Sequence, residues 1–170
     1  LWFEKAVKPK LRGEAHIVRY ADDFICCFQY ENEARSFYRQ LQARLAKFNL
    51  EISAEKSKII EFGRFAWDNR KRKGLGKPET FDFLGLTHYC STSRNGRFRV
   101  KRKTSKKKYR AALGRIKDWL VRNRNMPIVQ IHKALSVKLL GHYRYYGISD
   151  NSRICNFGFE VTRLFFKWIN

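Results

Sequence analysis

Apolar residues recur at helical intervals from Asn32 to Phe48. Successive apolar positions there are mostly three or four residues apart, which is the spacing of one face of an α-helix packed on a core. Asn32 is a suitable residue for the N-cap, and Asn49 can end the helix in the left-handed conformation. We therefore predict one amphipathic helix in the first third of the chain.

The same periodicity returns after Thr104. One stripe is broken at residues 125–127, a second ends near Gly147, and a third runs from Phe157 to Trp168. The first two stripes consist of Tyr109, Ala112, Leu113, Ile116 and Leu120, and of Ile128, Ile131, Leu135, Leu139 and Tyr143. This part of the chain is predicted to form a bundle of three helices.

Between these helical parts the pattern favours short strands. Asn95-Gly96 is a strong signal for a hairpin turn, and residues 64–80, with three Gly or Pro residues and a basic run, indicate an exposed loop. The segments expected to be strands are His16–Arg19, Phe24–Phe28, Leu50–Ile52, Ile59–Phe62, Phe81–Tyr89 and Arg97–Lys101. The predicted class is α+β, with a sheet domain over residues 1–103 and a helical domain over residues 104–170.

Charge points to a polyanionic partner. The 170 residues carry a net charge of +22, and residues 64–110 alone hold 16 basic and 3 acidic side chains. Nucleic acid is the first partner that such a surface suggests, and an acidic membrane surface is the second. No apolar run is long enough for a transmembrane span. The four cysteines form no Cys-x-x-Cys, which favours a reduced, cytoplasmic setting over a disulfide framework.

Two adjacent carboxylates stand between the first two predicted strands. Tyr20-Ala21-Asp22-Asp23 is flanked by apolar, β-prone residues on both sides, so the acids are expected at or beside a tight hairpin turn. Asp is common in turns for purely conformational reasons. Carboxylate oxygens at an open edge, however, also suit Mg²⁺, which prefers hard oxygen ligands.

The run Arg19-Tyr20-Ala21-Asp22-Asp23-Phe24 resembles the catalytic hairpin of reverse transcriptases, and most closely that of the group II intron reverse transcriptases, or maturases. The resemblance implies the C-terminal part of a polymerase palm, an antiparallel sheet with a helix, followed by an α-helical thumb bundle. It implies an RNA-directed DNA polymerase that copies an RNA template, in this family intron RNA, from a DNA or RNA primer and dNTPs with two Mg²⁺ ions, and that assists splicing. Asp22 would be the main metal ligand and Asp23 its support.

Two further segments match the family. Leu50-Glu51-Ile52-Ser53-Ala54-Glu55-Lys56-Ser57-Lys58 resembles the segment whose lysine lies near the incoming nucleotide, so Lys56 could assist the leaving pyrophosphate. Phe81-Asp82-Phe83-Leu84-Gly85 resembles the primer grip, with Phe83, Leu84 and Gly85 at its centre. Without the resemblance, Lys56 is interpreted as a solvated lysine in a turn, and Gly85 as a bulge glycine in a buried strand.

Basic residues in two runs are expected to contact RNA phosphates. The second run crosses from a strand into a helix start, where backbone amides also favour phosphate. A solvated charged face is the plainer interpretation of both runs. The residues are Arg70, Lys71, Arg72, Lys73, Lys101, Arg102, Lys103, Lys106, Lys107, Lys108 and Arg110.

The resemblance covers nearly all of the sequence but lacks the upstream polymerase motifs. The acid-bearing strand that palm polymerases place before the hairpin has no candidate here, since only Glu4 and Glu14 precede Asp22. We therefore expect a piece of a larger enzyme that is inactive alone. Two alternatives stay open: an RNA-binding maturase without polymerase activity, and a reverse transcriptase of another lineage, such as phage defence. The sequence does not determine the oligomeric state.

Overall fold

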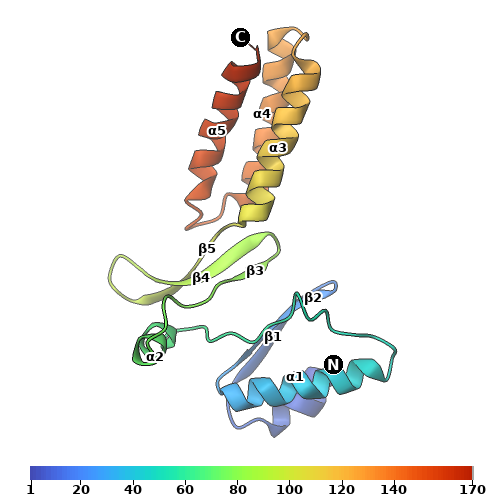
Figure 1. Ribbon diagram of the computed structural model, residues 1–170, viewed down its shortest axis with the longest axis vertical. Helices are drawn as coiled ribbons and strands as arrows, with labels where there is room; N and C mark the ends of the chain where they lie inside the picture. The colour runs from blue at the N-terminus through green and yellow to red at the C-terminus, as the bar shows by residue number, and fades with distance from the viewer. Residues whose placement is uncertain (170) are drawn as a thin grey trace. The chain divides into compact units, whose positions relative to one another are not determined.

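The computed structural model describes residues 1–169, and the chain divides into two compact units, Leu1–Glu61 and the residues from Phe62 onward (Figure 1). Helices accompany two small antiparallel sheets, which confirms the α+β class. The expected boundary near Lys103 falls inside the second unit, and the division into palm and thumb stays a prediction. In the described part of the chain, none of the helices has the length and apolar character needed to cross a bilayer.

The first unit is a β-hairpin covered on one face by helical segments. Its elements are η1 (Phe3–Val7), η2 (Lys8–Lys10), β1 (Ala15–Tyr20), β2 (Asp23–Phe28) and α1 (Glu31–Ala46). The predicted helix is thus confirmed, and Asn49 has the expected left-handed conformation, with φ +55°. Phe37 of α1 is buried, and its ring centroid lies 5.4 Å from that of Phe3 and 5.2 Å from that of Phe28. These aromatic contacts fix the hairpin against α1.

The second unit begins with α2 (Ala66–Arg72) and a three-stranded antiparallel meander. The strands are β3 (Phe81–Phe83), β4 (Leu86–Thr92) and β5 (Phe98–Thr104), in the order β3-β4-β5. Thr92 pairs with Phe98 across the Asn95-Gly96 hairpin, as the sequence predicts. At the other end of this hairpin Thr104 leads straight into the helices.

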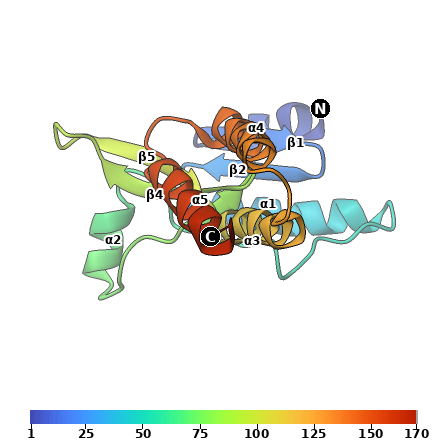
Figure 2. The ribbon, with the colours of Figure 1, turned by 90° about the horizontal axis from the view of Figure 1, so that it is seen from above.

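The bundle consists of α3 (Lys106–Asn123), α4 (Ile128–Tyr146) and α5 (Arg153–Ile169), which lie side by side (Figure 2). The predicted stripes form most of its core, with Leu120, Ile131 and Phe157 fully buried. Ile128 and Tyr143, the two ends of the second stripe, are exposed instead. His142 of α4 stacks on Phe157, with 3.6 Å between ring centroids. Burial, together with the positive charge of Arg115, lowers the pKa of His142, so this environment favours the neutral ring.

A buried polar joint ties the sheet to the bundle. Asn151, in the α4–α5 loop, accepts a hydrogen bond from the backbone N–H of Thr104 (3.0 Å) and donates from Nδ2 to Thr104 Oγ1 (2.9 Å) and to the carbonyl of Tyr146 (2.8 Å). Arg153 donates to the Thr104 carbonyl (2.6 Å). Thr104 and Asn151 are 0% and 4% exposed. Because these bonds satisfy the buried polar groups at the end of β5, they explain why the sheet and the bundle form one unit.

The expectation of a loop over residues 64–80 is wrong in part, because α2 lies within it. The sequence carries the termination signal of this helix at Gly74. Gly74 has φ +66° and donates to the carbonyl of Lys71, while Leu75 donates to that of Arg70, which together form a Schellman motif. Apart from this signal, a segment of seven residues with a run of charges has too little apolar periodicity to predict a helix.

Four other expectations need correction. Leu50–Ile52 and Ile59–Phe62 are not strands. The side chains of Leu50 and Ile59 are exposed, and an extended segment needs a partner strand to be stable. Phe81–Tyr89 is not one strand, because a two-residue turn separates β3 from β4. The N-cap of α1 is Tyr30 rather than Asn32.

Candidate active site and nucleic-acid interface

The two carboxylates stand at the tip of the β1–β2 hairpin. Tyr20 pairs with Asp23, so Ala21 and Asp22 form a two-residue turn in which Ala21 has φ +50°. Arg19 donates from Nε to the carbonyl of Ala21 (2.8 Å) and thereby holds the turn. The hairpin predicted from the sequence is thus confirmed, with Asp22 in the turn and Asp23 as the first residue of β2.

The hairpin has one packed and one open face. Ile17 and Cys26 pair across the strands and pack on the core of the unit, and burial, with Cys27 beside it, raises the pKa of Cys26 to about 12. Side chains alternate along a strand, so Tyr20 and Asp23 lie on the other face. Tyr20 is 65% exposed there. Asp23 therefore faces a surface that a substrate can reach.

The residues at this tip fit a hard divalent cation. Asp22 and Asp23 are both exposed, and in the part of the chain that the structure describes neither carboxylate has a hydrogen-bond or ion-pair partner. Free carboxylate oxygens of this kind suit Mg²⁺. Within residues 1–169, however, no group of three or more His, Cys, Asp or Glu side chains is placed to hold a metal. The hairpin supplies a pair of acidic ligands and no third one.

Lys56 belongs to the same unit but to another local structure. The backbone N–H groups of Lys56 and Ser57 both donate to the carbonyl of Ser53, which makes a compact turn, and the lysine side chain is exposed. Among the described residues its amine forms no ion pair with the hairpin acids. The proposed role of Lys56 beside the nucleotide stays a prediction.

The segment that resembles a primer grip is a strained turn between β3 and β4. Leu84 and Gly85 have φ +50° and +75°, and Phe83 pairs with Leu86, so the two central residues both take the left-handed conformation that a two-residue I′ turn requires. A leucine at positive φ is rare and needs support from its surroundings. The bulge-glycine interpretation of Gly85 is wrong, because the residue sits in this turn.

That support comes from the bundle. Tyr145 donates from its hydroxyl to the carbonyl of Leu84 (3.1 Å), and the backbone N–H of Ser105 donates to the carbonyl of Gly85 (2.9 Å). A Cβ on Gly85 would lie 2.8 Å from the hydroxyl of Tyr146, so a larger residue would have to displace that tyrosine and would also be strained at φ +75°. The sequence analysis missed this bracing by Tyr145, Tyr146 and Ser105. The two tyrosines belong to the run Gly141–Gly147, but nothing in the local sequence indicates that they reach the turn after β3.

The predicted nucleic-acid-binding residues lie on three elements of the second unit. Arg70, Lys71 and Arg72 end α2 and Lys73 is its C-cap; Lys101, Arg102 and Lys103 lie half-buried on β5; and Lys106, Lys107, Lys108 and Arg110 are exposed in the first turns of α3. Arg70 donates to the carbonyl of Gly76 (3.0 Å) and lies 3.7 Å from a carboxylate oxygen of Glu79, so its guanidinium also holds the loop after α2. The exposed lysines of α3 are the best placed to meet a phosphate.

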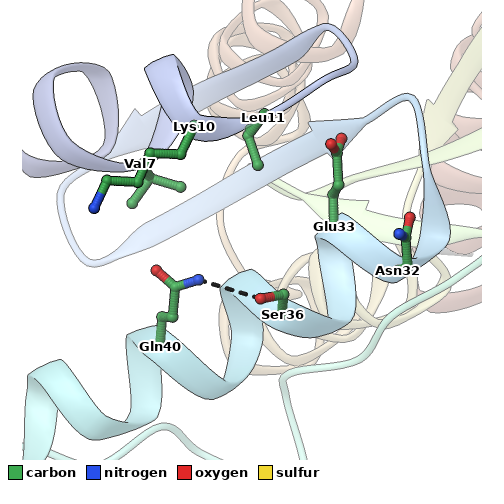
Figure 3. A pocket seen from close by; sticks show the side chains of 7 residues that line it. All are labelled: Val7, Lys10, Leu11, Asn32, Glu33, Ser36 and Gln40. Atoms are coloured by element: carbon green, nitrogen blue, oxygen red, sulfur yellow. Dashed lines mark hydrogen bonds between the residues drawn. The ribbon is translucent and has the colours of Figure 1, made fainter.

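A small polar cavity of about 220 Å³ lies between α1 and the η1–η2 segment (Figure 3). Glu33 accepts a hydrogen bond from the backbone N–H of Arg12 (2.7 Å) through one carboxylate oxygen, while the other is buried without a partner. One carboxylate that already caps a backbone N–H is not a catalytic arrangement. The cavity is therefore a gap in the packing of the first unit and is not part of the candidate site.

Comparison with known proteins matches one protein family. The family described as reverse transcriptase (RNA-dependent DNA polymerase) matches residues 2–88, which is 87 of the 170 residues and includes the hairpin, Lys56 and the β3–β4 turn. Searches of curated proteins and of solved structures returned no match. The matched region thus contains both acids of the hairpin and the turn that resembles a primer grip, and the chain belongs to the reverse transcriptase (RNA-dependent DNA polymerase) family.

Proposed function

We propose that this chain acts within a reverse transcriptase of the group II intron type, which copies RNA into DNA in the cytoplasm and helps its intron RNA to splice. The observation that carries the proposal is the pair of exposed, unpartnered carboxylates at the tip of a hairpin in a chain of the reverse transcriptase family. The braced turn and the basic helix start of the second unit support it, since a polymerase must hold a primer and template as well as react with them.

Asp22 and Asp23 would hold Mg²⁺. When bound, this ion activates the primer hydroxyl and stabilises the leaving pyrophosphate. Lys56 would place a positive charge beside that leaving group. A pair of metal ions needs more than two carboxylate ligands. A further carboxylate from outside these 170 residues would therefore complete the site, and the chain alone would not extend a primer.

The β3–β4 turn and α3 would bind the nucleic-acid backbone. The stem of Lys108 lies beside the turn, since a Cβ on Gly85 would be 3.5 Å from its Cγ. The turn is fixed by bonds to α4 and to the residue before α3, so the primer-contacting backbone and the first lysines of α3 would move together. A rigid support of this kind keeps the primer end within the small tolerance that catalysis allows.

Replacing Lys106, Lys107 and Lys108 together by glutamine is expected to reduce the salt dependence of RNA binding. Each phosphate contact on a single strand contributes about 0.7 to the slope of log affinity against log salt, so the slope should fall by about two units. Sequence preference should change little, because phosphate contacts position the RNA without reading bases. The measurement is RNA binding by fluorescence anisotropy over a salt series.

The fold should survive this triple change. Cations in the first turn of a helix oppose its dipole, so neutralising them should leave α3 as stable as before or slightly more stable, as circular dichroism would show. The matched control removes the same charge elsewhere in the bundle, at Lys117, Lys133 and Lys167. An unchanged slope in the α3 variant, or an equal fall in the control, would mean that the α3 lysines are only a solvated face.

The group II assignment is tested by the choice of RNA. If intron RNA is the partner, the full enzyme should bind a group II intron RNA at least about tenfold more tightly than a structured RNA of equal length, measured at the same salt concentration. Equal binding of the two RNAs, together with normal DNA synthesis, would favour a reverse transcriptase of another lineage. Selective binding without DNA synthesis would favour the maturase alternative.

A further inference from the structure

An open hollow of about 1210 Å³ lies in the second unit between α2 and the β4–β5 hairpin, which lie near each other in both ribbon views (Figures 1 and 2). Neither the hairpin acids nor the β3–β4 turn belongs to it. It exceeds the usual volume of a pocket for one drug-sized molecule. It has room for more than one nucleotide-sized group. We call it the α2 groove, and it is lined by Arg64, Phe65, Trp67, Asp68, Cys90, Ser91, Thr92, Asn95, Gly96, Arg97 and Phe98.

Aromatic rings are the first unusual feature of the α2 groove. Phe65 is 64% and Trp67 45% exposed, and Phe98 of β5 also lines the groove. Large aromatic side chains are normally buried, so two exposed rings that face one hollow indicate a binding surface. These two rings are not core residues, since the buried residue of α2 is Ala66, which is 2% exposed.

Charge and hydrogen-bonding capacity determine what the rings would bind. Arg64 and Arg97 stand at the groove, and the guanidinium carbon of Arg64 lies 5.5 Å from the centre of the Phe65 ring. Asp68 is the one acidic residue in the lining. Asn95, with Ser91 and Thr92, adds amide and hydroxyl groups that can donate and accept. Aromatic faces, arginines and small polar groups together are what proteins use to bind unpaired bases and the phosphates between them.

We propose that the α2 groove binds unpaired nucleotides of a single-stranded nucleic acid, with bases stacked on Trp67 and Phe65 and phosphates beside Arg64 and Arg97. An apolar peptide would leave both arginines unmatched, and a duplex would keep its base faces hidden. The proposal is independent of the polymerase assignment, since it uses none of Asp22, Asp23 and Lys56. A reverse transcriptase would thereby hold a strand at a place other than its reaction centre.

The experiment measures the affinity of the 170-residue chain for a labelled twelve-nucleotide oligouridine. Loss of one stacking contact should weaken binding by about fivefold to a hundredfold in Trp67→Ala. Phe65→Ser should weaken it similarly without harm to the fold, because residue 65 is the N-cap of α2 and serine is a good N-cap. Neither change should alter the salt slope, whereas Arg97→Gln should lower it by about 0.7. Phe159→Ser removes an equally exposed ring (65%) from α5, outside the groove, and should bind as the wild type does.

Matched ligands separate stacking from charge. An abasic strand of the same length carries the same phosphates without bases, so Trp67→Ala should bind it as tightly as the wild type does. The same should hold for a duplex. Single-stranded DNA in place of RNA shows whether the ribose hydroxyl contributes. The proposal is overturned if Trp67→Ala and Phe65→Ser bind oligouridine like the wild type, or if they lose affinity equally for the abasic strand.

Tryptophan fluorescence gives a second readout that does not depend on affinity. Stacked bases should quench Trp67, so the wild type should lose emission when oligouridine binds. Trp67→Phe should bind with near wild-type affinity but lose that quenching. Equal quenching in wild type and Trp67→Phe would place the bases on another tryptophan and contradict the proposal. If substitution of Asp22 by alanine left DNA synthesis unaffected, the proposed function would fail while all of these binding results stayed unchanged, so the two proposals fail separately.

Discussion

Asp22→Ala in the complete polymerase is expected to lower RNA-templated DNA synthesis by about a thousandfold or more. The change removes a carboxylate that has no other partner in the described structure, and loss of a metal ligand costs several kcal/mol of transition-state stabilisation. RNA binding should hardly change, since a single acid at a phosphate-binding surface does not attract RNA. Single-turnover primer extension at saturating primer-template measures the chemical step separately from binding.

The matched control is Asp118→Ala, which removes an exposed carboxylate from α3. It should copy RNA at the wild-type rate. Asp23→Ala should cause a smaller loss than Asp22→Ala if Asp23 supports the main ligand. DNA synthesis by Asp22→Ala at a near wild-type rate would contradict the catalytic assignment of the hairpin.

Asn151→Ala should have the largest effect on stability, lowering the free energy of unfolding of the second unit by about 2–4 kcal/mol. The amide makes three hydrogen bonds in a buried setting, to two groups of Thr104 and to the carbonyl of Tyr146. Alanine leaves the backbone N–H and the hydroxyl of the buried Thr104 without this partner, whereas the Tyr146 carbonyl still accepts from the backbone N–H of Ile148 (2.8 Å). Urea unfolding followed by circular dichroism measures the loss, and Asn125→Ala, at an exposed position, should leave stability within about 0.5 kcal/mol of the wild type.

The same variant tests whether the joint also fixes the β3–β4 turn. Tyr145 and Tyr146 end the helix whose following loop carries Asn151, so a loosened joint should free the turn. Amide hydrogen exchange at Ser105, whose N–H donates to the Gly85 carbonyl, should then become faster than in the wild type, whereas exchange at the centre of α3 should change less. If Asn151→Ala unfolds at the wild-type urea concentration, the joint is not what holds the sheet to the bundle.

Long periodic segments were predictable from the sequence, and short ones were not. The helices α3 and α4 have 18 and 19 residues, about five turns each, so tertiary packing and local preference agree over many positions. Leu50–Ile52 and Ile59–Phe62 have only a few apolar residues each, and no partner strand confirms them. The I′ turn at Leu84-Gly85 was hidden because leucine is not a turn residue, and the strain is balanced by distant contacts.

The position of the hairpin acids was predictable from the sequence, whereas the long-range hydrogen bonds of the second unit were not. Asp22 and Asp23 lie in a turn whose two strands are adjacent in the sequence, so local pattern suffices. The bond from Tyr145 to Leu84 spans 61 residues, and that from Thr104 to Asn151 spans 47. Contacts at such separations depend on how the sheet and bundle pack, which no local pattern encodes. The exposed rings of the α2 groove were missed for the same reason.

The most direct test of the central claim, that Asp22 is a metal ligand of a polymerase, is rescue of an Asp22→Cys variant by a softer metal. A thiolate is a poor ligand for Mg²⁺ and a good one for softer cations. Primer extension by Asp22→Cys in the complete enzyme should be lost with Mg²⁺ and recover at least about tenfold when Mn²⁺ or Cd²⁺ is added, while Asp22→Ala recovers less. Equal activity of the cysteine variant in Mg²⁺ and in the softer metals, or equal recovery of the alanine variant, would contradict metal binding at Asp22.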